Sequence, residues 1–439
     1  MTPSSPHPYI PNTNDDRREM LDAIGVATAD DLFADIPPTY RVDGLDLPPA
    51  LAEADLLREM SALAHRNTVA GNGVASFLGG GAYSHFIPST VDHVISRSEY
   101  YTAYTPYQPE ISQGTLQTMF ELQSMTCELL GMDIANGGMY DGASALAEAC
   151  LMACRVTGRS RIALHSSLNP SYVDVVRTYA SGPELDVDVL DVPNVTNEHA
   201  CLAVQQPTFL GELTDVWALG ESAHAAGALY ITSVDPISLG MLTPPGEYAA
   251  DIAVAEGQSL GWPANFGGPY LGLFTCRQEY VRQMPGRIVG RTTDLDGKTG
   301  YVLTLQTREQ HIRRERATSN ICTSQQLVGL AATVYLATLG KEGLKQIAEA
   351  CYHKAHYAAS QIDQLDGYSA SGDNPFFKEF VVSCPRPPAE INAALHERDI
   401  IGGLDASEHV DDGLLICVTE TNTRHEIDRL IDGLREAAQ

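Results

Sequence analysis

Two short stretches of the sequence carry groups that suit a phosphorylated, nitrogen-containing ring. Asp235 directly follows the apolar run 229–234, and a carboxylate at a strand end can pair with a ring nitrogen or cap a turn. Gly142, Ala143 and Ser144 open a predicted helix, and small residues at a helix start let backbone N–H groups reach an anion. Each feature also has a simpler explanation, as a turn cap and as an ordinary helix start.

A pyridoxal phosphate pocket of the aminotransferase kind needs both features and, in addition, a lysine some tens of residues after the aspartate. The sequence lacks that lysine. The chain has five lysines, the first at position 298, so none lies between Asp235 and Lys298. The segment 250–260 occupies the expected place, and Lys298 falls in 294–300, which reads as an exposed turn. The sequence therefore predicts that this chain alone does not hold the cofactor as an internal aldimine.

A glycine-rich loop precedes these features. Triple glycine permits close approach of a partner or ligand, or only shapes the loop; the candidates for a subunit contact are Gly79, Gly80, Gly81, Tyr83 and His85. No nucleotide-binding, hydrolase or zinc-protease motif is present.

The run 308–316 concentrates positive charge, with four arginines in nine residues. It fits a salt-bridged surface helix, or an anchor for an acidic partner surface or a carboxylate. Its candidate contact residues are Arg308, Arg313 and Arg314.

The cysteines do not suggest a disulfide framework or a metal site. There are nine, dispersed in apolar contexts, which indicates a reduced, cytoplasmic protein. Cys150 and Cys154 share a helix face and are expected to be buried small side chains. The cluster of Cys351, His353 and His356 has no fourth ligand nearby. The start of the chain has neither the basic nor the apolar region of a signal peptide, and no segment is apolar enough to span a membrane.

The composition is strongly acidic. With 28 Lys+Arg against 56 Asp+Glu, the formal net charge is −28, which opposes binding to nucleic acid and to anionic membranes. An acidic surface with few lysines also favours a halophilic protein, working in a salt-rich cytoplasm that screens the repulsion between its charges.

The hydrophobic pattern predicts an α/β fold. From about residue 140, short apolar runs alternate with helices, as expected for a mostly parallel sheet covered on both faces. We expect strands near 162–164, 187–190, 202–204, 229–234, 252–254 and 271–274. After about residue 321 the pattern changes to a smaller α+β domain. The predicted organisation is an N-terminal helical segment (1–75), a large domain (76–320) and a C-terminal small domain (321–439).

The residues also carry a family resemblance, which extends over essentially the whole chain. The most specific stretch is TLQTREQHIRRE at 304–315. Other matching stretches are 9–13, 17–21, 77–88, 100–110, 113–114, 140–144, 256–261, 266–270 and 284–287. In these the chain resembles the glycine decarboxylase (P-protein) family of the glycine cleavage system, in its split form with two different subunits.

This resemblance implies an aspartate aminotransferase-like large domain of pyridoxal phosphate (PLP) fold type I. It implies a homologous second subunit that carries the PLP lysine, with an α2β2 assembly. Together the subunits decarboxylate glycine, release CO2 and pass the aminomethyl group to the lipoyl arm of H-protein. This chain then has no catalytic residue of its own, is not active alone and does not hold PLP covalently.

Aligned with the lysine-bearing subunit, Gln258 and Ser259 fall at the positions of its histidine and its PLP lysine. Gly142, Ala143, Ser144 and Asp235 become remnants of a cofactor pocket. The alternative interpretation is a structural or regulatory pseudo-enzyme with no direct role in turnover.

Overall fold

The computed structural model describes residues 9–42, 44–71, 73–192, 194–322, 324–370 and 374–438. They divide into two compact units, Met1–Thr68 and Val69–Gln439. The first unit contains helices α1 (Asn14–Ile24) and α2 (Glu53–Ala64). The Thr13 side chain caps the start of α1, and Gly25 ends it with a positive φ of 86°, a conformation that glycine adopts without strain. The sequence predicts a buried face for α1, but no residue of α1 or α2 is buried.

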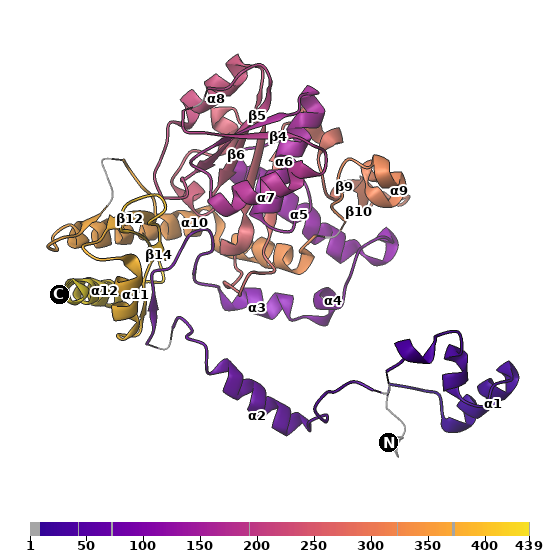
Figure 1. The fold of residues 1–439 in the computed structure, drawn as a ribbon. Helices are drawn as coiled ribbons and strands as arrows, with labels where there is room; N and C mark the ends of the chain where they lie inside the picture. The colour runs from indigo at the N-terminus through magenta and orange to yellow at the C-terminus, as the bar shows by residue number, and fades with distance from the viewer. Residues whose placement is uncertain are drawn as a thin grey trace. The chain divides into compact units, whose positions relative to one another are not determined.

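The second unit is built around a seven-stranded sheet, of which Figure 1 labels β4, β5 and β6. The strand order is β2-β8-β7-β6-β5-β3-β4. The five strands from β3 to β7 are parallel, and β8 runs against its neighbours β7 and β2. The bounds are β2 (Ile134–Ala135), β3 (Arg161–His165), β4 (Asp186–Leu190), β5 (His199–Gln206), β6 (Leu229–Val234), β7 (Ile252–Glu256) and β8 (Gly272–Cys276). All six apolar runs are thus strands, and the mostly parallel sheet is confirmed.

Helices cover both faces of this sheet because successive strand residues point to opposite sides. Ile162 and Leu164 of β3 pack in one core with α6 (Gly142–Thr157) and α7 (Pro170–Ser181). Ala163, between them, packs in the other core. That second core includes α5 (Gln113–Leu130), α8 (Val216–Ala225) and the long α10 (Gln326–Ile362).

The predicted helices at 324–339 and 341–363 appear as α10, whose helical geometry is broken at Gly340.

A two-stranded antiparallel sheet, β9 (Ile288–Thr293) with β10 (Thr299–Thr304), was not predicted, because its exposed residues give no apolar run. Lys298 lies in the turn between these strands and its side chain is 76% exposed, so the predicted exposed turn is confirmed. The remaining short helices are α3 (Ser89–Ile95), α4 (Ser98–Tyr101) and α9 (Gln310–Arg313).

The C-terminal part forms a four-stranded sheet in the order β11-β12-β15-β14. Its strands are β11 (Ser369–Ala370), β12 (Glu379–Ser383), β14 (Leu404–Asp405) and β15 (Gly413–Cys417), packed with α11 (Pro388–His396) and α12 (Arg424–Ala437). Strand β1 (Ala75–Ser76) pairs with β13 (Ile400–Ile401), so the chain before the large sheet is tied to this C-terminal part. The boundary at residues 320 and 321 stays a prediction. No helix in the described ranges combines the length and apolar character needed to cross a membrane.

Candidate functional site

Asp235 stands at the carboxyl end of β6, where ligands bind in sheets of this kind, but its partner is a side chain of the same protein. The Lys378 Nζ lies 2.7 Å from the Asp235 Oδ2, and the two side chains are only 2% and 8% exposed. Burial lowers the pKa of Lys378, but the charge and hydrogen bond of Asp235, together with smaller contributions from neighbouring groups, raise it overall. The pair is therefore an ammonium and a carboxylate, and the carboxylate that would receive a pyridinium nitrogen is already neutralised.

Lys378 also links Asp235 to a second buried carboxylate through His85. The ammonium lies 3.2 Å from the His85 Nε2, and the His85 Nδ1 lies 2.7 Å from the Glu420 Oε2. An ammonium can only donate, so Nε2 accepts and the neutral ring donates its Nδ1–H to Glu420. Burial lowers the pKa of His85, and the neighbouring Lys378 lowers it further, which agrees with a neutral ring. Burial raises the pKa of Glu420, but the hydrogen bonds from His85 and Phe86 outweigh this effect and hold the pKa below its usual range.

The glycine-rich loop closes over this pair. The Lys378 Nζ sits 3.5 Å from the centre of the Tyr83 ring, a favourable cation–π position. The Tyr83 hydroxyl donates to Glu379 at 2.7 Å, and the Gly80 N–H donates to the other oxygen of the same carboxylate at 2.7 Å. A Cβ on Gly79 would lie 2.2 Å from that carboxylate, so glycine is required for a close contact within the chain. Whether these residues also contact another subunit stays a prediction.

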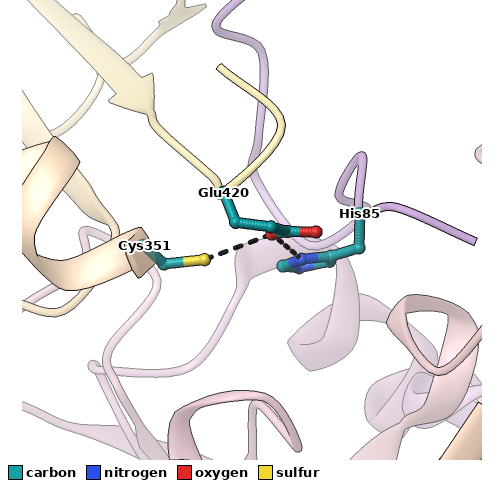
Figure 2. A group of neighbouring side chains, drawn as sticks. All are labelled: His85, Cys351 and Glu420. Carbon is teal, nitrogen blue, oxygen red and sulfur yellow. Dashed lines mark hydrogen bonds and ion pairs between the residues drawn. The ribbon is translucent and has the colours of Figure 1, made fainter. Parts of the chain in front are cut away.

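Figure 2 shows His85, Cys351 and Glu420 pointing toward one another. Their potential ligand atoms all lie within 4.8 Å of one another. A zinc ion accepts such residue types, but hydrogen bonds explain the group. Glu420 accepts from His85 and, at 3.4 Å, from the Cys351 thiol. Burial raises the pKa of Cys351, and the Lys378 ammonium on the far side of the His85 ring disfavours a second cation. We interpret the group as a hydrogen-bonded cluster that anchors α10 to the loop.

The second predicted feature, the start of α6, is also satisfied by side chains of the chain. The Asp141 carboxylate accepts from the Ser144 N–H at 2.7 Å, and the Glu256 Oε2 accepts from the Gly142 N–H at 2.8 Å. The other Glu256 oxygen accepts from the backbone of Gln258 and Leu271. Glu256, the last residue of β7, thus stands where a phosphate would dock on the helix N-terminus, and Asp141 stands beside it.

A small cavity lies between Asp235 and Glu256. Asp235 and Glu256 line the same cavity, together with Tyr83, Asn169 and Tyr172, and its volume is about 30 Å³, enough for one or two water molecules. A pyridine ring does not fit there. The charges present therefore do not fit pyridoxal phosphate, because an ammonium occupies the aspartate and the Asp141 and Glu256 side chains occupy the N–H groups at the phosphate position. A larger cavity of about 560 Å³ adjoins the small one and shares Asn169, Tyr172 and Glu256 with it.

Ser259 is buried in the turn Gly257–Ser259 that follows β7, and its hydroxyl has no hydrogen-bond partner among the described residues. Gln258 beside it exchanges hydrogen bonds with the backbone of Tyr83 at 2.9 Å in both directions. The amide thus fixes the glycine-rich loop to the end of β7. Ser259 offers no amine at this position.

The buried carboxyl group of Glu256 should make the free energy of unfolding fall as the pH rises. Burial raises its pKa to about 7, although three backbone N–H groups lower it. The folded state then binds a proton more tightly than the unfolded state, so stability is lost as pH rises from about 4.3 to 7. We expect the wild type to lose on the order of 2–3 kcal/mol more than Glu256→Gln over this window. Chemical unfolding at a series of pH values measures the difference in slope; equal slopes for both proteins would contradict it.

The sequence predicted Asp235 and the start of α6 as site features, but it did not predict that Lys378 pairs with Asp235 or that Glu256 accepts from the Gly142 N–H. A signal was present in each case, since a lysine follows Phe376-Phe377 at a strand start and a glutamate ends the apolar run 252–255.

The other sequence candidates lie elsewhere in the structure. Arg308 is buried and donates to the backbone oxygens of Met284 and Gly286, while Arg313 and Arg314 are exposed around the four-residue helix α9. Cys150 and Cys154 are buried, as predicted. His353 is exposed, and the His356 Nε2–H donates to the backbone oxygen of Phe376, so neither joins Cys351.

The chain is similar to known proteins along nearly its whole length. Residues 7–434 match the family described as "Glycine cleavage system P-protein". The chain is 51% identical over 447 residues to a "Probable glycine dehydrogenase (decarboxylating) subunit 1" of Thermomicrobium roseum, covering 98% of this chain and 99% of that one. It is 53% identical over 440 residues to the protein of the same name in Chlorobium limicola, covering 97% and 99%.

Solved structures extend the comparison to the fold. A crystal structure of glycine decarboxylase (P-protein), in inhibitor-bound form, superposes with a TM-score of 0.93 at 42% identity, covering 98% of this chain and 100% of that one. A cysteine desulfurase from Thermococcus onnurineus reaches a TM-score of 0.62 at 16% identity, covering 84% and 95%. These neighbours have PLP fold type I, so the predicted fold class is confirmed.

Proposed function

The chain belongs to the glycine cleavage system P-protein family, and on this basis we propose that it is the subunit whose own pocket holds no cofactor. Its role lies in the glycine cleavage system, as one subunit of the decarboxylating glycine dehydrogenase. The observation that carries the proposal is the self-occupied pocket, with Lys378 on Asp235 and Glu256 on the start of α6. The chain keeps the architecture of a PLP enzyme and fills the cofactor position with its own side chains.

The cofactor is then held by a homologous, lysine-bearing subunit, and the names of the relatives, "subunit 1", support such a partner. On that subunit PLP supplies the electron sink for glycine decarboxylation. In this proposal the complex is α2β2, CO2 is released, and the aminomethyl group passes to the lipoyl arm of H-protein. This chain completes and stabilises the active assembly.

The N-terminal unit supports a partner of this kind. Apolar side chains of α2 repeat along one stripe, and Leu56, Met60 and Leu63 are 48%, 55% and 45% exposed. Isolated helices of 11 or 12 residues are marginally stable in water, so α1 and α2 need an apolar surface to cover them. We assign that surface to the lysine-bearing subunit.

The function is tested by reconstitution. Each subunit is purified separately, and glycine-dependent carboxyl exchange with H-protein is measured for each chain and for their mixture. We expect no activity from this chain alone and full activity at a one-to-one ratio. Activity of this chain alone would contradict the proposal. Full activity of the partner alone would favour the alternative interpretation, in which this chain is a structural or regulatory pseudo-enzyme.

The same reconstitution tests the proposed environment, a salt-rich cytoplasm. With a net charge of −28, the acidic side chains of the folded protein repel one another at low ionic strength. Salt screens that repulsion. Activity should therefore rise between low and molar potassium chloride. An activity that is highest at low salt would assign the acidic composition to an ordinary enzyme.

A further inference from the structure

A second cavity, far from the cofactor-like pocket, has arginines as half of its lining residues. Its volume is about 370 Å³, and the guanidinium groups of five arginines surround it: Arg155, Arg282, Arg308, Arg313 and Arg316. Arg155 lies near the end of α6, whereas the cofactor-like pocket lies at Gly142, where α6 begins. At 1.5 Å per residue the two places are roughly 20 Å apart along the helix. The cavity is therefore a separate site.

The charge in this cavity is poorly compensated, although the chain carries two acidic residues for each basic one. Among the described residues, no carboxylate lies within 4 Å of the Arg282 or Arg313 guanidinium, and Arg316 has only its exposed neighbour Glu315, at 3.9 Å. Glu148 and Glu309 exert a weaker attraction on Arg155 and Arg308. Gathering five like charges without matching anions is unfavourable unless another anion completes the set.

At the base of the cavity, hydrogen bonds hold Arg155 and Arg308 in place, and each keeps one N–H group without a partner. Arg308, 8% exposed, donates to the backbone oxygens of Met284 and Gly286, and its Nε has no hydrogen-bond partner. Arg155 donates to the Gln283 oxygen at 3.2 Å, and its Nε is likewise without a partner. Burial lowers the pKa of both arginines, so their charged forms lack solvation that a bound anion would restore. The exposed Arg282, Arg313 and Arg316 form the rim.

We propose that this arginine-lined cavity binds a small multivalent oxyanion, a phosphate ester or a polycarboxylate. Its volume lies in the range of small-molecule sites, about 300–1,000 Å³. The planar guanidinium suits paired contacts to phosphate and carboxylate oxygens. Since the cavity joins the end of α6 to residues 305–318, the bound anion ties that segment to the body of the chain. This goes beyond the proposed function, which does not use these residues.

The test measures binding of inorganic pyrophosphate and of citrate to the full-length chain by titration calorimetry. It is run at the lowest salt concentration at which circular dichroism shows a folded protein. We expect one site per chain, a rise in the unfolding temperature with the probe, and an affinity that falls with added salt. Tighter pyrophosphate binding identifies a phosphate ester as the ligand class, and tighter citrate binding identifies a polycarboxylate.

The variants change only rim residues, because Arg155 and Arg308 also hold backbone oxygens. Arg282→Gln and Arg313→Gln should each weaken binding at least about fivefold, as expected for losing a charge-assisted contact. Arg291→Gln is the matched control, since Arg291 is exposed in β9 and lies outside the cavity. Absence of binding, or an equal loss in Arg291→Gln, would overturn the site. Displacement of the probe, one for one, by the lysine-bearing subunit would also overturn it, by making the cavity a protein interface.

Discussion

Replacing Lys378 by methionine is expected to destabilise the folded chain by about 3–5 kcal/mol, the usual cost of removing one partner of a buried ion pair. Methionine keeps the length of the side chain but leaves the Asp235 carboxylate, 8% exposed, without its cation. It also removes the cation above the Tyr83 ring and the donor to His85. Chemical unfolding followed by circular dichroism, at one fixed salt concentration, measures the loss.

Two companion variants separate the ion pair from general damage to the core. Lys378→Met combined with Asp235→Asn removes both charges and keeps an acceptor for the Ile237 N–H, so it should recover most of the lost stability. Lys298→Met changes a 76% exposed lysine and should stay within about 0.5 kcal/mol of wild type. A double variant as unstable as the single one would show that the pair does not carry the effect.

Deleting residues 1–68 is expected to abolish assembly with the lysine-bearing subunit while the remaining chain stays folded. The cut follows the boundary between the two units, and the cores of the second unit contain no residue before Ala75. Covering an apolar side chain contributes roughly 1.5–3 kcal/mol. Losing several of them should weaken association more than about 100-fold, or roughly 2.8 kcal/mol at 1.4 kcal/mol per tenfold. Sedimentation of mixed subunits measures the affinity.

A pair of point variants tests the same surface without deleting it. Met60→Asp places a charge in the apolar stripe of α2 and should weaken association, because burying an unpaired carboxylate is costly. Ala62→Asp adds the same charge to the opposite face of the same helix, where Ala62 is also exposed, and should leave association unchanged. Normal assembly of the deletion variant, or equal effects of the two aspartates, would remove the N-terminal unit from the interface.

The fold could be predicted from the sequence because its strands are buried on both faces. Such strands form continuous apolar runs, as at 229–234 and 252–254, and the runs alternate with helices that begin and end at recognisable caps. The β9–β10 pair was missed since its strands are partly exposed and held together by local pairing. Burial of α1 was predicted from its spacing, but periodicity does not say which surface covers an apolar face.

The site was predictable only in part. Asp235 and the start of α6 are local features, and a missing lysine can be counted. Their occupants come from distant segments: Lys378 precedes a strand of the C-terminal sheet, and Glu256 ends β7 on the other side of the pocket. Which of many charged residues meets Asp235 depends on how two sheets pack together, and no spacing in the chain encodes it. A lysine in an otherwise apolar segment was the available signal.

Covalent labelling distinguishes a chain that fills its own cofactor position from one that binds the cofactor itself. The chain alone, its partner alone and their complex are incubated with PLP and reduced with borohydride, and each lysine is examined by mass spectrometry. We predict a pyridoxyl group at a single lysine of the partner, no label on Lys378, and no visible aldimine absorption from the lone chain. Stoichiometric colour in the lone chain, with the label on Lys378, would contradict the account.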